Sequence, residues 1–159
     1  MENEFYNAFA SPMIITQNTM LENETGTTQK PPKLMSIEEY SRWAERFKNW
    51  VQAYYLDAWD YIEFRYIRPV KDDGKKVDIK DLSVEEKQKY KNEKLMVSLL
   101  QQAIKVEILI LLQHNDSAQS IWKELKSKFV GSKEMIKNKT SLMKKEFDLF
   151  RGLRNDSTK

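Results

Sequence analysis

The chain has 159 residues, of which 40% are hydrophobic and 32% are charged, and its formal net charge is +3. This length is enough for one domain with a hydrophobic core. Four glycines and four prolines are too few for the turns of a β-sandwich, and the absence of cysteine excludes disulfides, thiol chemistry and cysteine-ligated metals. The composition therefore predicts an all-α protein.

The positive charge is concentrated toward the C-terminus. Residues 117–159 hold eleven Lys or Arg against five Asp or Glu, whereas residues 1–116 hold sixteen against nineteen. A basic segment of this kind can contact an acidic partner or a nucleic-acid backbone. A lysine-rich, solvated helix face has the same composition, and this second interpretation is favoured.

Targeting and membrane signals are not found in the sequence. No apolar run approaches the roughly 20 residues of a membrane-spanning helix. The first residues, Met1-Glu2-Asn3-Glu4, do not have the basic start and apolar block of a secretory signal. We therefore expect a cytoplasmic protein that does not bind membranes.

The N-terminal residues 1–33 are predicted to be a disordered tail. Asn, Thr, Glu and Gln dominate them without a helical period, and Pro31-Pro32 forms a stiff, extended boundary. A helical domain is expected over residues 34–155, followed by a short tail at residues 156–159.

The first helix of this domain is predicted to run from Ser36 to about Tyr55, with Ser36 and Glu39 as its capping box. Aromatic residues recur along it at spacings of three and four, which places them on one face. Such a stripe can be a ligand shelf but is usually core, and we expect core here. Its members are Tyr40, Trp43, Phe47, Trp50 and Tyr54.

A shorter second helix is predicted to begin at Asp57 and to end before Pro69, with a charged loop over residues 69–81 that turns at Asp73-Gly74. Three residues form the inner side of this helix. They are Trp59, Ile62 and Tyr66.

The third helix is predicted to begin with a capping box formed by Ser83 and Glu86. Its apolar positions continue to Leu112, and one helix of about 30 residues would be about 45 Å long. Because that is long for a domain of this size, we expect a bend at residues 104–106.

Two further helices are predicted in the C-terminal part. Asp116 and Gln119 cap the first, which ends at Gly131 in the left-handed conformation that glycine favours. Ser132 then caps a last helix that runs to about Gly152. The expected fold is thus a compact bundle of five to six helices.

The last predicted helix carries two apolar stripes about 100° apart, which is a wider arc than one neighbouring helix covers. Its first stripe consists of Ile136, Met143, Phe147 and Phe150. The second stripe is our candidate self-association face and consists of Met135, Leu142, Leu149 and Leu153. Six large residues are predicted to form the core, namely Trp43, Phe47, Trp50, Trp59, Trp122 and Phe147.

Motifs for catalysis or cofactor binding are not found. The four glycines are scattered and form no phosphate loop, and the single histidine, His114, is expected to have a capping or surface role. We therefore expect no enzyme, no cofactor, no metal and no small-molecule ligand. Three lysines are candidate nonspecific nucleic-acid contacts, namely Lys133, Lys137 and Lys144.

An ordered set of short motifs carries a resemblance to a known family. The set consists of Pro31-Pro32-Lys33-Leu34, Tyr40-Ser41-Arg42-Trp43 with Phe47, Asp81-Leu82-Ser83 with Glu85-Glu86-Lys87 and Tyr90-Lys91, Leu99-Leu100-Gln101, Asp116-Ser117-Ala118 with Ile121-Trp122, Gly131-Ser132, and Glu146-Phe147-Asp148 with Phe150-Arg151. In this order they resemble the N-terminal, capsid-type part of the gag polyprotein of copia-type LTR retrotransposons, especially those of plants.

The resemblance implies an α-helical capsid-type domain that oligomerises into a shell around the element's RNA. Members of this family usually have Gly-Leu-Pro where this chain has Ala103-Ile104-Lys105. The zinc knuckle is missing because there is no cysteine, and the enzymatic pol regions are missing too, so we expect a truncated or co-opted gag without specific RNA packaging.

Three hypotheses follow from the sequence. The first is a structural gag domain that associates with itself or with other gag chains. The alternative is a nonspecific nucleic-acid-binding module that uses the basic C-terminal third. The third is a remnant of an element that has lost its role.

Overall fold

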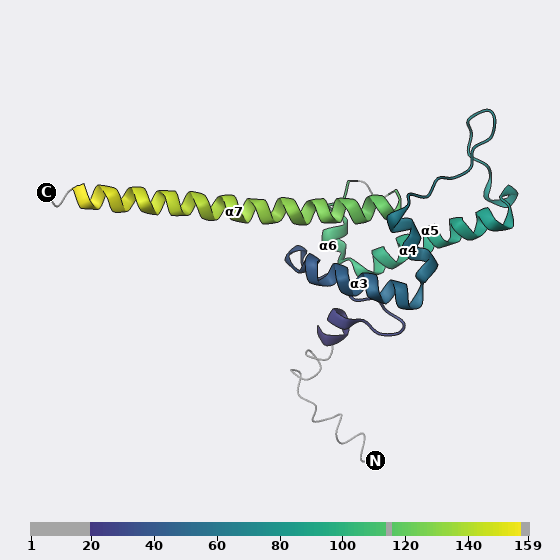
Figure 1. Ribbon diagram of the computed structural model, residues 1–159, viewed down its shortest axis with the longest axis horizontal. Coiled ribbons are helices and arrows are strands. Elements are labelled where there is room, and N and C mark those ends of the chain that lie inside the picture. Colours follow the sequence, from purple (N-terminus) through teal and green to yellow (C-terminus); the bar gives the residue numbers. More distant parts are fainter. Residues whose placement is uncertain (1–19, 114–115, 157–159) are drawn as a thin grey trace, which may run out of the picture.

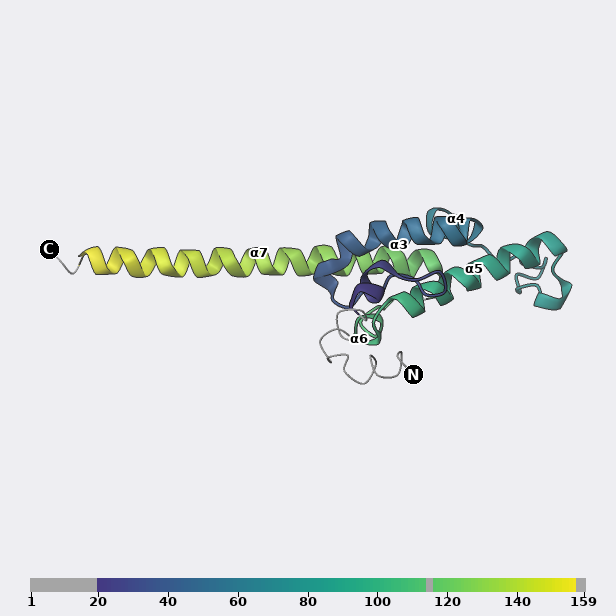
Figure 2. The ribbon, with the colours of Figure 1, turned by 90° about the horizontal axis from the view of Figure 1, so that it is seen from below.

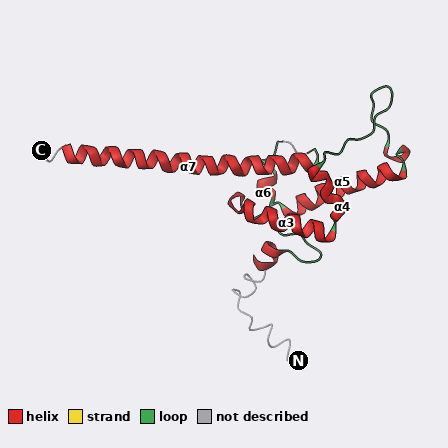
Figure 3. Cartoon of the chain, in the orientation of Figure 1, coloured by secondary structure: helices red, strands yellow, loops and turns green. Residues whose placement is uncertain are grey.

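The structure is a computed structural model that describes residues 20–113 and 116–156. Its main helices are α3 (Tyr40–Tyr54), α4 (Leu56–Glu63), α5 (Val84–Ala103), α6 (Val106–Leu109) and α7 (Ala118–Asp156), with the 3-10 turns η1 (Ile37–Glu39) and η2 (Ile79–Asp81). Helices joined by loops make up the described part of the chain, which contains no strand (Figure 3). The predicted all-α fold class is confirmed.

The helices form a small body from which α7 projects. Helix α4 packs on α3, on α5 and on the beginning of α7, which also contacts α5 and η1. The remainder of α7 continues in a straight line away from this body (Figures 1 and 2).

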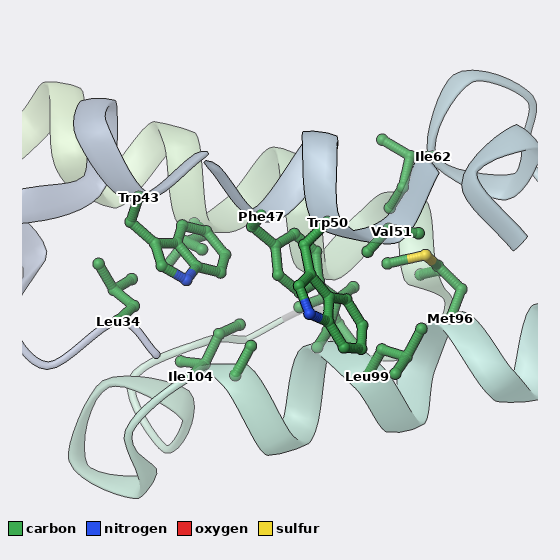
Figure 4. Packing of buried hydrophobic residues seen from close by; sticks show 14 of the residues in the cluster. Leu34, Trp43, Phe47, Trp50, Val51, Ile62, Met96, Leu99 and Ile104 are labelled. Atoms are coloured by element: carbon green, nitrogen blue, oxygen red, sulfur yellow. The ribbon is translucent and has the colours of Figure 1, made fainter. Parts of the chain in front are cut away.

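The core lies between α3 and α5, with α4 and the first turns of α7 completing it (Figure 4). Helix α3 forms because its apolar residues recur at helical spacing, and its buried face contains Tyr40, Trp43, Phe47 and Trp50 as predicted from that spacing. Tyr54, at the end of the stripe, is 50% exposed.

Among the predicted core residues, Trp43, Phe47, Trp50 and Trp59 are buried, and Trp122 is partly buried against them. The prediction that Phe147 belongs to the core is wrong. Its side chain is 62% exposed, because it lies on the part of α7 that has left the body.

Two predicted helix starts differ in detail. Ser36 does not cap the first helix; its hydroxyl donates to Glu38 Oε2 at 2.6 Å, and η1 precedes α3. Helix α4 starts after Tyr55 rather than at Asp57, and it ends at Glu63, well before Pro69. Tyr66 therefore lies in the segment after α4 and not on its inner side.

The prediction of a disordered tail is wrong for residues 20–33. Residues 20–25 are helical, and Pro31 and Pro32 are buried. The indole N–H groups of Trp43 and Trp50 donate to the carbonyl oxygens of Pro32 and Thr27, at 2.8 and 2.7 Å. Because buried tryptophans need acceptors, the α3 stripe fixes this segment as well. Residues 1–19 lie outside the described part.

The expected bend at residues 104–106 is confirmed. Helix α5 ends at Ala103 and α6 begins at Val106, without a glycine or proline at the junction. A backbone bridge to the N-terminal segment replaces the lost helical bonds, because Leu34 N–H donates to Ala103 O at 2.7 Å and Lys105 N–H donates to Leu34 O at 3.1 Å. Leu34 is fully buried there.

The predicted cap of α5 and the predicted loop turn are also found. Glu86 N–H donates to Ser83 Oγ at 3.1 Å, which begins α5. In the loop, Gly74 has a positive φ of 81°, and the chain reverses there so that Val70 pairs with Lys76.

The prediction that Gly131 ends a helix is wrong. Helix α7 is continuous over 39 residues, so Ser132 caps nothing, and Gly131 is not among the glycines with positive φ. Apart from the adjacent residues and the backbone of the helix itself, no atom lies within 4 Å of the position that a Cβ on Gly131 would occupy. Nothing therefore requires glycine at this point of the helix.

We predict that Gly131→Ala stabilises α7 by about 0.5–1 kcal/mol, because alanine loses less conformational entropy in a helix interior. Slower amide hydrogen exchange around residue 131 would show this. Gly74→Ala is the matched control and should be destabilising, since Gly74 has positive φ. Faster exchange in Gly131→Ala would instead indicate a left-handed residue and two separate helices.

Candidate interaction surface on helix α7

Helix α7 begins with a reciprocal capping box. Ser120 N–H donates to Ser117 Oγ at 3.1 Å, and Ser117 N–H donates to Ser120 Oγ at 3.0 Å. The cap is therefore Ser117, and the predicted pair of Asp116 and Gln119 does not form it. Asp116 instead accepts from the Ser120 hydroxyl at 2.9 Å.

The start of α7 is also held by the helices beneath it. The buried Glu93 of α5 accepts from Ala118 N–H through Oε1 at 2.9 Å. The Gln119 amide donates to the last carbonyl groups of α4, those of Ile62 and Glu63, at 3.3 and 3.2 Å. Both interactions satisfy backbone groups that a helix end leaves unpaired.

The carboxyl of Glu93 lies in an unusual environment for an acid. It is 4% exposed, and its second oxygen, Oε2, has no hydrogen-bond partner among the described residues. Burial raises the pKa of this carboxyl, and the N–H of Ala118 offsets only part of that effect.

An aromatic cluster fixes the direction of α7. The ring of Trp122 lies 5.7 and 5.9 Å from those of Trp43 and Phe47, and 5.2 Å from that of Trp59 in an edge-on contact. Phe129, two turns later, lies 5.1 Å from Tyr40 at the start of α3. Beyond Phe129 the helix leaves the body, and every residue from Lys133 to Arg154 is exposed.

The exposed part of α7 keeps the apolar pattern of the buried part. Every seventh residue from the core outward is apolar, in the order Trp122, Phe129, Ile136, Met143 and Phe150. A period of seven is typical of helices that pack along another helix over several turns.

The two predicted stripes thus lie on one exposed surface, which we call the α7 arc. The candidate self-association face forms one flank of it, and its members are exposed by 74, 60, 70 and 71% at Met135, Leu142, Leu149 and Leu153. Ile136, Met143, Phe147 and Phe150 form the other flank, exposed by 55, 63, 62 and 65%. Lys139 and Glu146 lie between the flanks.

The opposite side of α7 is basic. The three predicted contacts Lys133, Lys137 and Lys144 are exposed there and follow one another at spacings of four and seven. Lys126 and Arg151 extend the same row by one residue at each end. The projecting helix therefore has an apolar side and a positively charged side.

A cleft lies where α7 leaves the body. Its volume is about 250 Å³, and it is lined by Glu38, Ser41, Phe129, Ser132, Lys133 and Ile136. The cleft joins the outer end of the core to the first residues of the α7 arc.

Within the described ranges, no group of three or more His, Asp or Glu side chains is placed to hold a metal ion. None of the described helices is long and apolar enough to span a membrane. The single histidine, His114, lies outside the described residues.

Comparison with models of known protein families, with curated protein sequences and with solved structures gives no match in any of the three. The resemblance to gag therefore stays a prediction.

Sequence reasoning missed Glu93 as the partner of the α7 terminus. Its neighbours in the sequence, Asn92 and Lys94, are typical of a solvated helix face, and Glu93 itself looked like one more surface charge. The available signal was its spacing of three and seven from the buried Met96 and Leu100, which places it on the inner face of α5.

We predict different effects of two substitutions at Glu93. Glu93→Ala leaves the Ala118 N–H without an acceptor and should cost about 1–3 kcal/mol of unfolding free energy at pH 7. Glu93→Gln retains a carbonyl acceptor without the buried charge, so its stability should equal or exceed that of the wild type. Urea denaturation measures both.

The difference between wild type and Glu93→Gln should depend on pH. Because the pKa of Glu93 is raised in the folded protein, protonation favours folding, and the wild type loses stability relative to Glu93→Gln as pH rises through about 4.3 toward 7. A difference that does not change between pH 4 and 7, or one of opposite sign, would contradict this account.

Proposed function

We propose that this chain is a structural protein that associates with copies of itself, as the capsid-type domain of copia-type gag polyproteins does. On this proposal its partners are other copies or other gag chains, it acts in the cytoplasm, and it is not an enzyme. The observation that carries the proposal is the exposed α7 arc, and the ordered motifs that resemble gag support it.

The size of the α7 arc supports association. Eight large apolar side chains, each at least 55% exposed, follow one another over about five turns on one flank and about four on the other. Each of them would contribute about 1.5–3 kcal/mol if fully buried. Contiguous exposed surfaces of this kind usually mark interaction sites.

A second candidate function, nonspecific nucleic-acid binding, is favoured by the basic row on the opposite side of α7. Five cations at helical spacing can follow a phosphate backbone without reading its sequence. The two functions use different sides of one helix, so each can be tested without disturbing the other.

Self-association predicts that the protein is oligomeric and that Leu142→Glu shifts the association equilibrium at least tenfold toward the monomer, because it places a charge in the arc. Leu56→Glu is the matched control, since Leu56 is 62% exposed on α4 and Leu142 is 60% exposed. Light scattering after size-exclusion chromatography measures both. A wild type that stays monomeric at high concentration and does not join full-length gag assemblies would contradict the proposal.

Nucleic-acid binding predicts that reversing the charge of Lys133, Lys137 and Lys144 weakens binding to single-stranded RNA. It also predicts that the slope of log K for binding against log salt concentration becomes less steep by about 2. The matched control reverses three exposed loop lysines, Lys71, Lys75 and Lys76. Equal effects of the two triple variants would indicate general electrostatic attraction and would exclude a site on α7.

A further inference from the structure

We infer that two copies of this chain pair through the α7 arc as antiparallel helices, with a two-fold axis between Leu142 and Met143. The inference rests on the proposed self-association and specifies its surface, orientation and register. Two features of α7 lead to this arrangement.

The first feature is the charge along the middle of the arc, where Lys139 and Glu146 lie between the apolar flanks. In a parallel, in-register pair each of them would face its own copy, so that like charges meet. In an antiparallel pair centred between Leu142 and Met143, Lys139 of each copy lies level with Glu146 of the other. A parallel pair shifted by seven residues would form only one such pair, whereas this antiparallel register pairs all four charges, and opposite charges of this kind fix orientation and register.

The second feature is the match of the flanks. In antiparallel helices each flank meets the same flank of the other helix. Met135 then lies beside Leu149 of the second copy, and Leu142 beside its own equivalent. On the other flank, Ile136 meets Phe150, and Met143 meets Met143. Apolar side chains thus contact apolar side chains throughout this segment.

The cleft at the base of α7 fits this arrangement. Leu153 of the second copy lies level with Ser132, and Phe150 lies about one residue's rise from the level of Ile136. Both Ser132 and Ile136 line the cleft of about 250 Å³. The second copy therefore brings two large apolar side chains to the cleft of the first copy, where Phe129 and Ile136 of the first copy are already apolar lining residues.

A second copy accounts for these matches better than an unrelated helix does. Any amphipathic helix can cover an apolar face. An unrelated helix would not explain why the charged and apolar residues of α7 match those of a second α7 that runs in the opposite direction. Self-complementarity is the property that a two-fold symmetric interface requires.

The absence of cysteine permits a direct test by disulfide cross-linking of the full chain. Two single variants are used, Ser132→Cys and Leu153→Cys, which lie about 30 Å apart along one helix. A mixture of the two should form a mixed disulfide dimer, and neither variant should form one alone. Both positions lie outside the core, so folding, checked by circular dichroism, is retained.

A charge exchange tests the register separately. Lys139→Glu places like charges together at two points and should weaken association about tenfold. Lys139→Glu with Glu146→Lys restores opposite pairs and should return association to the wild-type level. The matching loss and recovery would not occur if these residues faced solvent.

The outcomes separate this inference from the proposed function. A disulfide in Ser132→Cys alone shows a parallel pair and overturns the inference. Oligomers that form no disulfide in the mixture associate through another surface, which overturns the inference but leaves self-association standing. If the wild-type protein is monomeric, both the antiparallel pairing and the proposed self-association are wrong.

Discussion

The packing of Trp122 is the interaction on which the rest of the structure depends. Its ring contacts aromatic rings of α3 and of α4, and it belongs to α7, so three helices meet at one side chain. Aromatic contacts of this geometry add about 0.5–1.5 kcal/mol each to the area that they bury. Because a ring held from several sides cannot rotate, this packing also fixes the direction in which α7 leaves the body.

The backbone constraints of the fold are satisfied around the same cluster. Trp43 and Trp50 take their acceptors from the segment before α3, and Leu34 in that segment pairs with the junction between α5 and α6. Glu93 and Gln119 then connect the start of α7 to α5 and α4. Each connection uses a polar group that would otherwise be buried without a partner, which is why an all-helical body this small keeps one arrangement.

The features that could be predicted from the sequence are those that depend on residues close together along the chain. Helical spacing identified the buried face of α3, the capping-box motif identified the Ser83 cap, and the Asp73-Gly74 pair identified the loop turn. The predictions that were wrong concern residues whose structure depends on other parts of the chain. Pro31 and Pro32 looked like the end of a disordered tail because their contacts are with distant tryptophans. Gly131 was predicted to end a helix from its residue type alone, but one glycine inside a helix costs only about 1 kcal/mol, and α7 continues through it.

The same reasoning explains why Phe147 was assigned to the core. Its spacing is that of a buried residue, and a sequence pattern shows that a face is apolar without showing what covers it. Among the described residues no element packs on the outer part of α7, so its apolar side is exposed there. A long single helix gains little stability from its own hydrogen bonds in water and depends on packing along its apolar side. On the pairing proposed above, the straight projection of α7 is one half of an interface, whose other half is the same helix in a second copy.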